Sequence, residues 1–345
     1  ETTPDSTVPV LVTDLDESEA NLILATLDPL AAMANADLET FEALRKMTDV
    51  ESEALAAVLQ SISDEQLHPL MSKKPGPIEG HTDPDDVPPV EQSPWVQEGD
   101  LFQLGEHRLL CGDATSPDSI EVLMGGNTID VIFTDPPYNV DYSSKNELLN
   151  LYDNLYDKGN HIQAPIQGDR ISAIGYQNFC ESYYLATEPF LSDTNSIYIC
   201  GNYESLIPYY KLGSMKISNM LVWVKNTLVI GRMDYQNRHE FILYGWSGKH
   251  RWYSDRKQST VWEIPKPHKS ELHPTMKPVE LVEKAIANSS EPGNIIYDSF
   301  SGSGTTIIAS ERLGRRCYAM EIDPRYVQVV IERWEAFTQR KAVQL

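Results

Sequence analysis

The sequence predicts an α/β protein built on a doubly wound, mainly parallel β-sheet, with a small, mostly helical N-terminal module. From residue 107 onward, apolar segments of strand length alternate with segments of helical periodicity. A turn rich in glycine and serine at 299–304 joins one such strand to a helix. A stretch at 71–94, rich in proline and acidic residues, has the composition of a linker and separates this region from the N-terminal module.

The individual elements follow from hydrophobic spacing. Seven strands are expected at 107–112, 129–134, 196–200, 219–225, 239–244, 294–298 and 316–321. Helices are expected at 117–124, 176–191, 278–288, 304–313 and 324–340, and the polar stretch 143–172 is expected to be a loop. In the N-terminal module a strand at 7–15 precedes helices at 17–27, 38–47 and 51–62. We therefore predict three parts, 1–70, 71–94 and 95–345.

Charge is distributed unevenly along the 345 residues, whose formal net charge is −23. Residues 1–99 contain 21 acidic and 4 basic residues, whereas residues 211–277 contain 12 basic and 5 acidic ones. A surface that meets nucleic acid needs lysine and arginine opposite phosphate. The middle of the second part is therefore the region where such a surface is expected.

Several classes of protein are disfavoured by what the sequence lacks. No apolar run reaches the roughly 20 residues that cross a bilayer, and the first residues do not have the pattern of a signal peptide. The four cysteines are scattered without CxxC spacing, so neither a metal site nor a disulfide framework is expected. We expect a cytoplasmic protein.

A first motif, Asp135-Pro136-Pro137-Tyr138, follows the predicted strand 129–134. Its carboxylate and a backbone carbonyl can accept the two hydrogens of an amino group, and consecutive prolines stiffen the loop that carries them. Its aromatic ring can stack on a planar base. An ordinary turn after a buried strand is the alternative for this motif taken alone.

A second motif follows the predicted strand 294–298 and consists of Asp298, Ser299, Phe300, Ser301, Gly302, Ser303, Gly304, Thr305 and Thr306. Glycines let the backbone turn tightly and approach a ligand, and the next helix begins with exposed amides. Glu321 ends the following strand, where a carboxylate can accept both hydroxyls of a ribose. A dinucleotide site is the alternative, although the third glycine of its fingerprint would fall at Ile307.

Together, and in this order, the two motifs make residues 99–337 resemble the β class of amino-methylating DNA methyltransferases. The resemblance implies the Rossmann-like, seven-stranded fold of S-adenosylmethionine-dependent methyltransferases. It implies methyl transfer from S-adenosylmethionine to a base flipped out of double-stranded DNA. An aspartate at the start of the first motif favours adenine N6, with cytosine N4 as the alternative. Cytosine carbon-5 chemistry would need a Pro-Cys dipeptide, which is absent.

The resemblance also assigns roles to residues. Asp135, Pro136, Pro137 and Tyr138 would be catalytic. The cofactor would be bound by Asp113, Thr275, Lys277, Asp298, Phe300, Ser301, Gly302, Ser303, Gly304, Thr305, Glu321 and Asp323, with Thr275 and Lys277 at the methionine carboxylate. Contacts to DNA are expected within a target-recognition region at about 205–272, from Lys225, Arg232, Arg238, Lys249 and Arg251, where aromatic residues alternate with bases.

Other interpretations stay open at this point. The N-terminal module resembles the latter part of a ParB-like domain, and a small acidic module used for packing or pairing is the alternative. The resemblance leaves open a homodimer. A non-catalytic DNA-binding or regulatory protein would not require the intact motifs. A nicotinamide-dependent oxidoreductase would leave the Asp-Pro-Pro-Tyr turn and the basic region unexplained.

Overall fold

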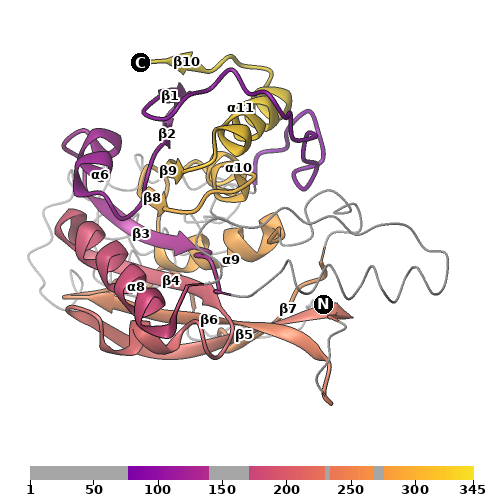
Figure 1. The fold of residues 1–345 in the computed structure, drawn as a ribbon. Coiled ribbons are helices and arrows are strands. Elements are labelled where there is room, and N and C mark those ends of the chain that lie inside the picture. The colour runs from indigo at the N-terminus through magenta and orange to yellow at the C-terminus, as the bar shows by residue number, and fades with distance from the viewer. Residues whose placement is uncertain (1–76, 140–170, 230–233, 256, 267–275) are drawn as a thin grey trace, which may run out of the picture. The chain divides into compact units, whose positions relative to one another are not determined.

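The computed structural model describes residues 77–139, 171–229, 234–255, 257–266 and 276–345 (Figure 1). All of them belong to one compact unit, Pro77–Leu345. The strand and the three helices expected at 7–62 lie outside the described residues, as does nearly all of the loop expected at 143–172.

A single mixed sheet runs through this unit and contains ten strands within the described residues. Their order across the sheet is β10-β1-β2-β9-β8-β3-β4-β6-β5-β7. The strands are β1 Leu101–Leu104, β2 His107–Cys111, β3 Ile129–Thr134, β4 Leu191–Gly201, β5 Met215–Val229, β6 Asn237–Ser247, β7 Val261–Glu263, β8 Ile295–Asp298, β9 Arg316–Glu321 and β10 Val343–Gln344.

The prediction of a seven-stranded, mainly parallel sheet is confirmed only in part, because the described sheet has ten strands and is mixed. All seven predicted strands are present, but β1, β7 and β10 extend the sheet at its two sides. These three strands are only two to four residues long, too short to show the alternation that marks a strand in a sequence. Four of the nine strand pairs are antiparallel, because β1 and β10 join one side as antiparallel neighbours and β6 reverses direction between β4 and β5.

Helices cover both faces of the sheet (Figure 1). Val131 and Phe133 of β3 belong to one apolar cluster with residues of α9, α10 and α11, whereas Ile132 points to a second cluster with α6 and α8. The helices are α6 Pro117–Met124, α8 Ala173–Thr187, α9 Val279–Ser289, α10 Thr305–Arg312 and α11 Pro324–Thr338, with short 3₁₀ turns η2 Glu188–Phe190 and η3 Ile207–Lys211. None of these described helices has the length and apolarity of a membrane span.

Helix α8 differs from the helix predicted at 176–191. It begins three residues earlier because the Ser172 side chain accepts a hydrogen bond from the backbone N–H of Gly175 and caps the helix. It ends at Thr187 because Pro189 has no backbone N–H to continue the helical hydrogen bonds, and the chain passes into the 3₁₀ turn η2. Strand β4 consequently begins at Leu191, five residues before the predicted position.

The described part of the predicted linker packs against the sheet unit. The backbone N–H of Ile78 donates to the carbonyl of Arg312 at 2.7 Å, and that of His81 donates to the carbonyl of Phe337 at 2.8 Å. The Asp85 side chain accepts a hydrogen bond from the first residue of α9. Composition identified this stretch as polar and proline-rich, but these bonds make residues 77–86 a strap along α9, α10 and α11.

One edge of the sheet gathers the ends of its parallel strands. Strands β2, β9, β8, β3 and β4 are parallel neighbours, so their carboxyl ends lie at the same edge. In register, Cys111 pairs with Glu321, and Asp298 pairs with Ala319. Both motifs of the sequence follow strands that end here, which is where ligands bind in open α/β sheets.

Candidate active site

The loop after β3 is held by side chains of other elements. Its Pro137 carbonyl accepts a hydrogen bond from the Tyr176 hydroxyl of α8 at 2.9 Å. The Tyr138 hydroxyl donates to Asp135 Oδ1 at 2.6 Å. Asn139 has a φ of 55°, and its side-chain amide bonds the backbone of Ile171 in both directions. The Asp-Pro-Pro-Tyr segment is therefore fixed to α8 rather than free at the end of its strand.

Lys277 lies at the centre of this site. Its Nζ is 2.5 Å from Asp135 Oδ2 and 3.2 Å from the Tyr138 hydroxyl. A third contact, also 3.2 Å, joins it to Glu240 Oε2. Only 7% of the Lys277 side chain is exposed. The three hydrogens of this buried ammonium are thus directed at three partners, which lie on β6 and on the loop of residues 135–138, the predicted catalytic loop.

Glu240 on β6 is in turn paired with Lys225 on the neighbouring strand β5, through its Oε1. Burial would raise the pKa of Glu240, but the charges of Lys277 and Lys225 outweigh it and lower this pKa to about 2. Burial would lower the pKa of Lys277, but the carboxylates of Asp135 and Glu240 raise it. Two ammonium groups and two carboxylates therefore form one charge-balanced cluster.

Sequence reasoning missed the role of Glu240 and misplaced that of Lys225. Lys225 was expected to contact DNA from the surface, but its side chain is 6% exposed and bonded within the cluster. A signal for Glu240 was present, because it is a charged residue directly before the apolar run 241–244. Such a residue on a largely buried strand usually has a specific partner.

Asp298, at the end of β8, joins the glycine loop to the catalytic loop. Its Oδ1 accepts hydrogen bonds from Thr134 Oγ1 at 3.3 Å and from the Phe300 N–H at 3.2 Å, and its Oδ2 accepts from Thr306 Oγ1 at 2.6 Å. Burial, with a smaller effect from nearby Asp135, raises the pKa of Asp298 to about 7. Thr134 directly precedes Asp135, so the Asp298 carboxylate connects the residue before the first motif with two residues of the second motif.

The two glycines of the loop have different surroundings. Both have positive φ angles, 51° at Gly302 and 83° at Gly304. A Cβ at Gly304 would lie 2.8 Å from Val330 Cγ1, whereas one at Gly302 would meet no described atom within 4 Å. The Gly302 N–H donates to Glu321 Oε2 at 2.8 Å. In the described part of the chain, the buried Ser301 Oγ has no hydrogen-bond partner.

The remaining acids expected at the cofactor lie at adjacent strand ends. Glu321 accepts a hydrogen bond from the Asp323 N–H at 3.0 Å, and burial raises the pKa of Glu321. Asp323 caps α11 and pairs with Arg325 at 2.6 Å. Asp113 is exposed just after β2, where it accepts a hydrogen bond from the Thr115 N–H at 2.8 Å.

Arg333 of α11, which the sequence analysis did not single out, holds the end of the glycine loop. Its Nη1 donates to the Ser303 carbonyl at 2.9 Å and lies 3.3 Å from Thr305 Oγ1. Its Nη2 donates to the Pro84 carbonyl of the strap at 2.6 Å. Burial lowers the pKa of Arg333 to about 10. The ring of Phe300 packs against aromatic rings of α8, so the loop is held from both faces of the sheet.

Comparison with known proteins identifies the family of the chain. Residues 129–332, more than half of the chain, match the N6_N4_Mtase family, described as DNA methylase. The chain belongs to this DNA methylase family. The resemblance found in the sequence is thereby confirmed at the level of a DNA methyltransferase. The match does not distinguish adenine from cytosine, and it does not reach the N-terminal module.

Two curated relatives of the methylase are type II methyltransferases. M.HinfI of Haemophilus influenzae is 25% identical over 252 residues, which cover 63% of this chain and 66% of the relative, slightly under two thirds of its length. M2.MboI of Moraxella bovis is 26% identical over 237 residues, 61% of this chain and 82% of the relative. Among solved structures, the PvuII DNA methyltransferase, described as cytosine-N4-specific, has a TM-score of 0.50 at 15% identity, over 71% of this chain and 89% of that one. The structural likeness shows a shared fold.

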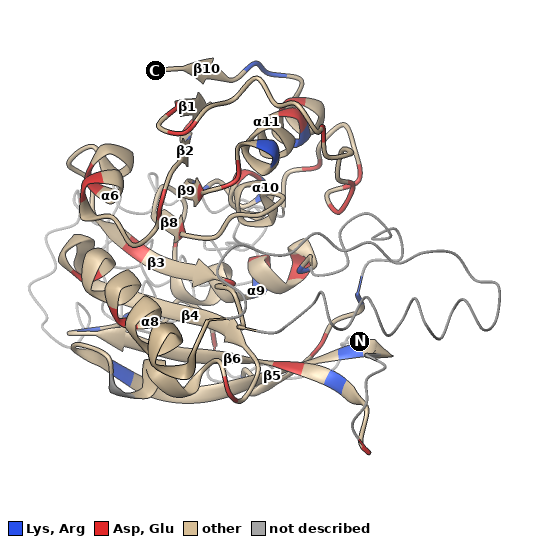
Figure 2. Cartoon of the chain, in the orientation of Figure 1, with Lys and Arg blue, Asp and Glu red and all other residues tan. Residues whose placement is uncertain are grey.

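The lysine and arginine residues expected to contact DNA do not lie on one surface of the methylase. Arg238 is exposed at the start of β6, on the edge that carries Asp135. Lys249 and Arg251 are exposed beyond the other end of β6, where the Lys249 backbone bonds to the start of β4. Figure 2 shows lysine or arginine positions toward both ends of β5 as well. Arg232 and Thr275 lie outside the described residues.

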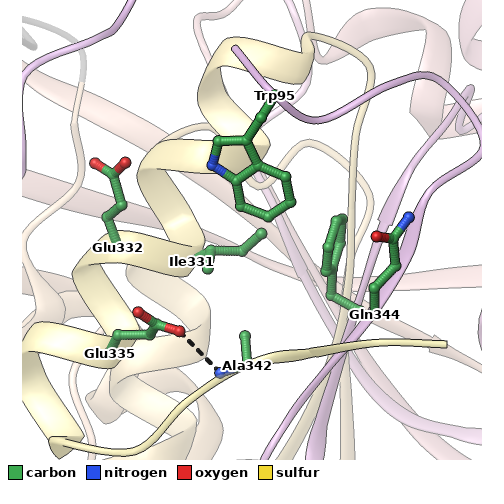
Figure 3. A pocket seen from close by; sticks show the side chains of 7 residues that line it. Trp95, Ile331, Glu332, Glu335, Ala342 and Gln344 are labelled. Carbon is green, nitrogen blue, oxygen red and sulfur yellow. Dashed lines mark hydrogen bonds between the residues drawn. The ribbon is translucent and has the colours of Figure 1, made fainter.

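A hollow on another side of the methylase does not belong to this site. It lies between α11 and the strands β1 and β10, and Figure 3 shows Trp95, Glu332 and Gln344 around it. No residue of the catalytic loop or the glycine loop lines it. The candidate active site is therefore the strand edge described above.

Proposed function

We propose that this methylase transfers a methyl group from S-adenosylmethionine to the N6 amino group of adenine in double-stranded DNA. Membership of the DNA methylase family supports methyl transfer to DNA. The observation that carries the proposal is the bond between Thr134 and Asp298. It joins the start of the catalytic loop to the strand that begins the glycine loop, so a cofactor and a base bound at these loops would meet.

The described residues fit the proposed cofactor. When bound, S-adenosylmethionine supplies an electrophilic methyl group on a sulfonium. The face of Gly302 is open, and Ser301 Oγ is buried without a partner in the described part of the chain, so the loop offers both space and an unused polar atom. Glu321 would accept hydrogen bonds from the ribose hydroxyls of the cofactor, and the exposed Asp113 would contact the adenine ring of the cofactor. Phe300, Ser303, Gly304, Thr305 and Asp323 would complete this site, and Lys277 and Thr275 would bind the methionine carboxylate.

The catalytic loop solves a specific chemical problem. The lone pair of an exocyclic amine is conjugated with the ring, so the nitrogen is a weak nucleophile. Asp135 would accept one N–H hydrogen and the Pro136 carbonyl the other, which draws the nitrogen toward tetrahedral geometry and turns its lone pair toward the methyl group. Tyr138 would stack on the base, which has to leave the duplex for its amine to be reached. The contribution is positioning and electrostatic stabilisation.

Adenine is favoured over cytosine because aspartate, rather than serine, begins the catalytic motif. Cytosine N4 is the second candidate, since both bases present a conjugated exocyclic amine and the two reactions need the same acceptors. The likeness to the cytosine-N4-specific PvuII enzyme concerns the fold and does not favour either base.

The test is methylation of unmethylated genomic DNA with labelled S-adenosylmethionine, followed by digestion to nucleosides. N6-methyladenine is expected from the wild type and none from Asp135→Ala. Asp118→Ala, which removes an exposed aspartate of α6, is the matched control and should retain activity. N4-methylcytosine would replace the proposed base but keep the mechanism, whereas an Asp135→Ala variant as active as the wild type would remove the proposed catalytic carboxylate.

A further inference from the structure

Both oxygens of Asp135 are occupied in the structure. Oδ1 accepts the Tyr138 hydroxyl at 2.6 Å, and Oδ2 accepts the Lys277 ammonium at 2.5 Å. The proposed reaction requires one of these oxygens to accept an N–H hydrogen of the target base. An ammonium bonded to a carboxylate also weakens that carboxylate as an acceptor. A shift of Lys277 away from Asp135 would therefore strengthen this carboxylate as the acceptor of the amine.

Glu240 provides the alternative partner that makes this exchange possible. A buried ammonium that left Asp135 with no other side-chain carboxylate in reach would depend on the carboxylate of the cofactor alone, and an incompletely paired buried charge is unfavourable. Lys277 already lies 3.2 Å from Glu240 Oε2, so a small shift away from Asp135 leaves it paired. Lys225 occupies the other oxygen of Glu240 and fixes its orientation from the adjacent strand.

We infer that Glu240 is a positioning residue that holds Lys277 and thereby frees Asp135 to accept the amine of the target base. The inference rests on the proposed function in one respect, the role of Asp135 as the acceptor. Glu240 does not itself bind the base, because both of its oxygens are engaged by lysines. Its effect passes through Lys277.

The first experiment replaces the charge of Glu240 and keeps its length. In Glu240→Gln, Lys277 loses one of its two side-chain carboxylate partners and stays on Asp135. The single-turnover rate of methyl transfer, at saturating DNA and labelled S-adenosylmethionine, should fall about tenfold or more, a loss typical of a weakened transition-state contact. The affinity for S-adenosylmethionine, measured by calorimetry, should change less than about threefold because Lys277 keeps its charge.

Glu263→Gln is the matched control. Glu263 is an exposed glutamate on β7, in register with Val224 of β5, so that strand β5 lies between it and the strand of Glu240. The same chemical change there should leave both the rate and the cofactor affinity unchanged. An equal loss of rate in both variants would overturn the inference, since it would reflect loss of negative charge near β5 in general.

A double-mutant cycle tests the route of the effect. In a Lys277→Met background, Glu240→Gln should change the rate less than about twofold, because the residue through which Glu240 acts is gone. An undiminished loss would show that Glu240 acts independently and would overturn the inference. If Lys277→Met is too slow to measure or Glu240→Gln does not fold, Glu240→Asp decides, since it keeps the charge. Glu240→Asp should transfer the methyl group faster than Glu240→Gln. Where Glu240→Gln does not fold, the rate of Glu240→Asp should be less than about tenfold below that of the wild type. A larger loss of rate would overturn the inference.

Failure of this inference can be separated from failure of the proposed function. If the wild type methylates DNA and Asp135→Ala does not, while Glu240→Gln equals the wild type, only the role of Glu240 is wrong. If Asp135→Ala is as active as the wild type, the proposed acceptor itself is wrong. Counting transferred methyl groups tests the role of Glu240 equally well whether the product is N6-methyladenine or N4-methylcytosine.

Discussion

The proposed catalytic side and the proposed cofactor side of the candidate active site are held together in different ways. On the catalytic side, Lys277 bonds Asp135 across 142 positions of the chain, and Tyr138 lies next to Glu240 across 102. On the cofactor side, each of three carboxylates accepts a hydrogen bond from an N–H only two residues further along. They are Asp113, Asp298 and Glu321, which accept from Thr115, Phe300 and Asp323.

The difference shows what a short motif can specify. A carboxylate that bonds the backbone two residues away needs only local turn geometry, which a few residues provide. A cluster of four charged side chains from β5, β6 and the segments after β3 and before α9 requires the whole sheet to be assembled. We therefore expect substitutions on the cofactor side to act locally, and substitutions on the catalytic side to act on partners far along the chain.

Arg333 makes long-range bonds on the cofactor side, and its removal should have the largest effect on stability. Arg333→Met would leave the carbonyls of Ser303 and Pro84 without their donor, at a cost of about 2–4 kcal/mol in the free energy of unfolding. Arg325→Met, which removes a partly exposed local pair with Asp323, should cost less than about 1 kcal/mol. Urea unfolding measures both, and similar losses would show that the strap contact contributes little.

Tyr138 separates stacking from hydrogen bonding on the catalytic side. Tyr138→Ala removes the ring, and base–aromatic stacking is worth about 1–3 kcal/mol, so kcat/KM for DNA should fall about 10- to 100-fold. Tyr138→Phe keeps the ring and loses only the hydroxyl, with its bonds to Asp135, Lys277 and Glu240, so its loss should stay below about tenfold. A phenylalanine variant as slow as the alanine variant would mean that the hydroxyl matters more than the ring.

The two glycines of the loop should respond differently to alanine. Both substitutions strain a positive φ angle by about 1 kcal/mol. Gly304→Ala also forces a methyl group against Val330, so its total loss of stability should reach about 2 kcal/mol. Gly302→Ala meets no described atom and should mainly weaken binding of S-adenosylmethionine. Thermal unfolding and calorimetry distinguish the two, and equal stabilities would contradict the packing of Gly304.

Asp298 predicts a dependence of stability on pH. Its pKa is about 7 in the folded protein against an ordinary value of 3.8. Between these pH values the folded state binds a proton that the unfolded state does not. The contribution of this proton to the free energy of unfolding is therefore complete below pH 3.8 and is lost as the pH rises through 7. The stability of the wild type relative to Asp298→Asn should therefore fall by about 1–2 kcal/mol between pH 6 and pH 8. A difference that does not vary with pH would contradict the raised pKa.

The smallest expected effect concerns exposed arginine and lysine side chains. Arg238 lies on the active-site edge, so Arg238→Ala should weaken DNA binding several-fold and reduce the slope of log affinity against log salt by about 1. Lys249 lies at the opposite edge, so Lys249→Ala should change neither. Fluorescence anisotropy at several salt concentrations compares them. Equal effects would place DNA over both edges of the sheet.

Much of the fold could be predicted from the sequence because its elements carry their own periodicity. The strand 129–134 and the helix 117–124 have the predicted bounds, and both motifs lie at the predicted strand ends. The end of α8 could not be read from periodicity, because Pro189 ended it earlier than the apolar spacing indicated. Strands of two to four residues formed only because a neighbouring strand was available to pair with.

By itself, the sequence determined the alternation of strands and helices, the Asp-Pro-Pro-Tyr turn and the glycine loop, since each depends on residues close together in the chain. The tertiary structure alone decided which distant charges meet. Lys225 and Lys249 are near each other in the sequence, yet β5 and β6 are antiparallel, so the first joins Glu240 in the active site and the second lies at the far edge. Strand order and register, which no local pattern encodes, placed Lys277 between Asp135 and Glu240.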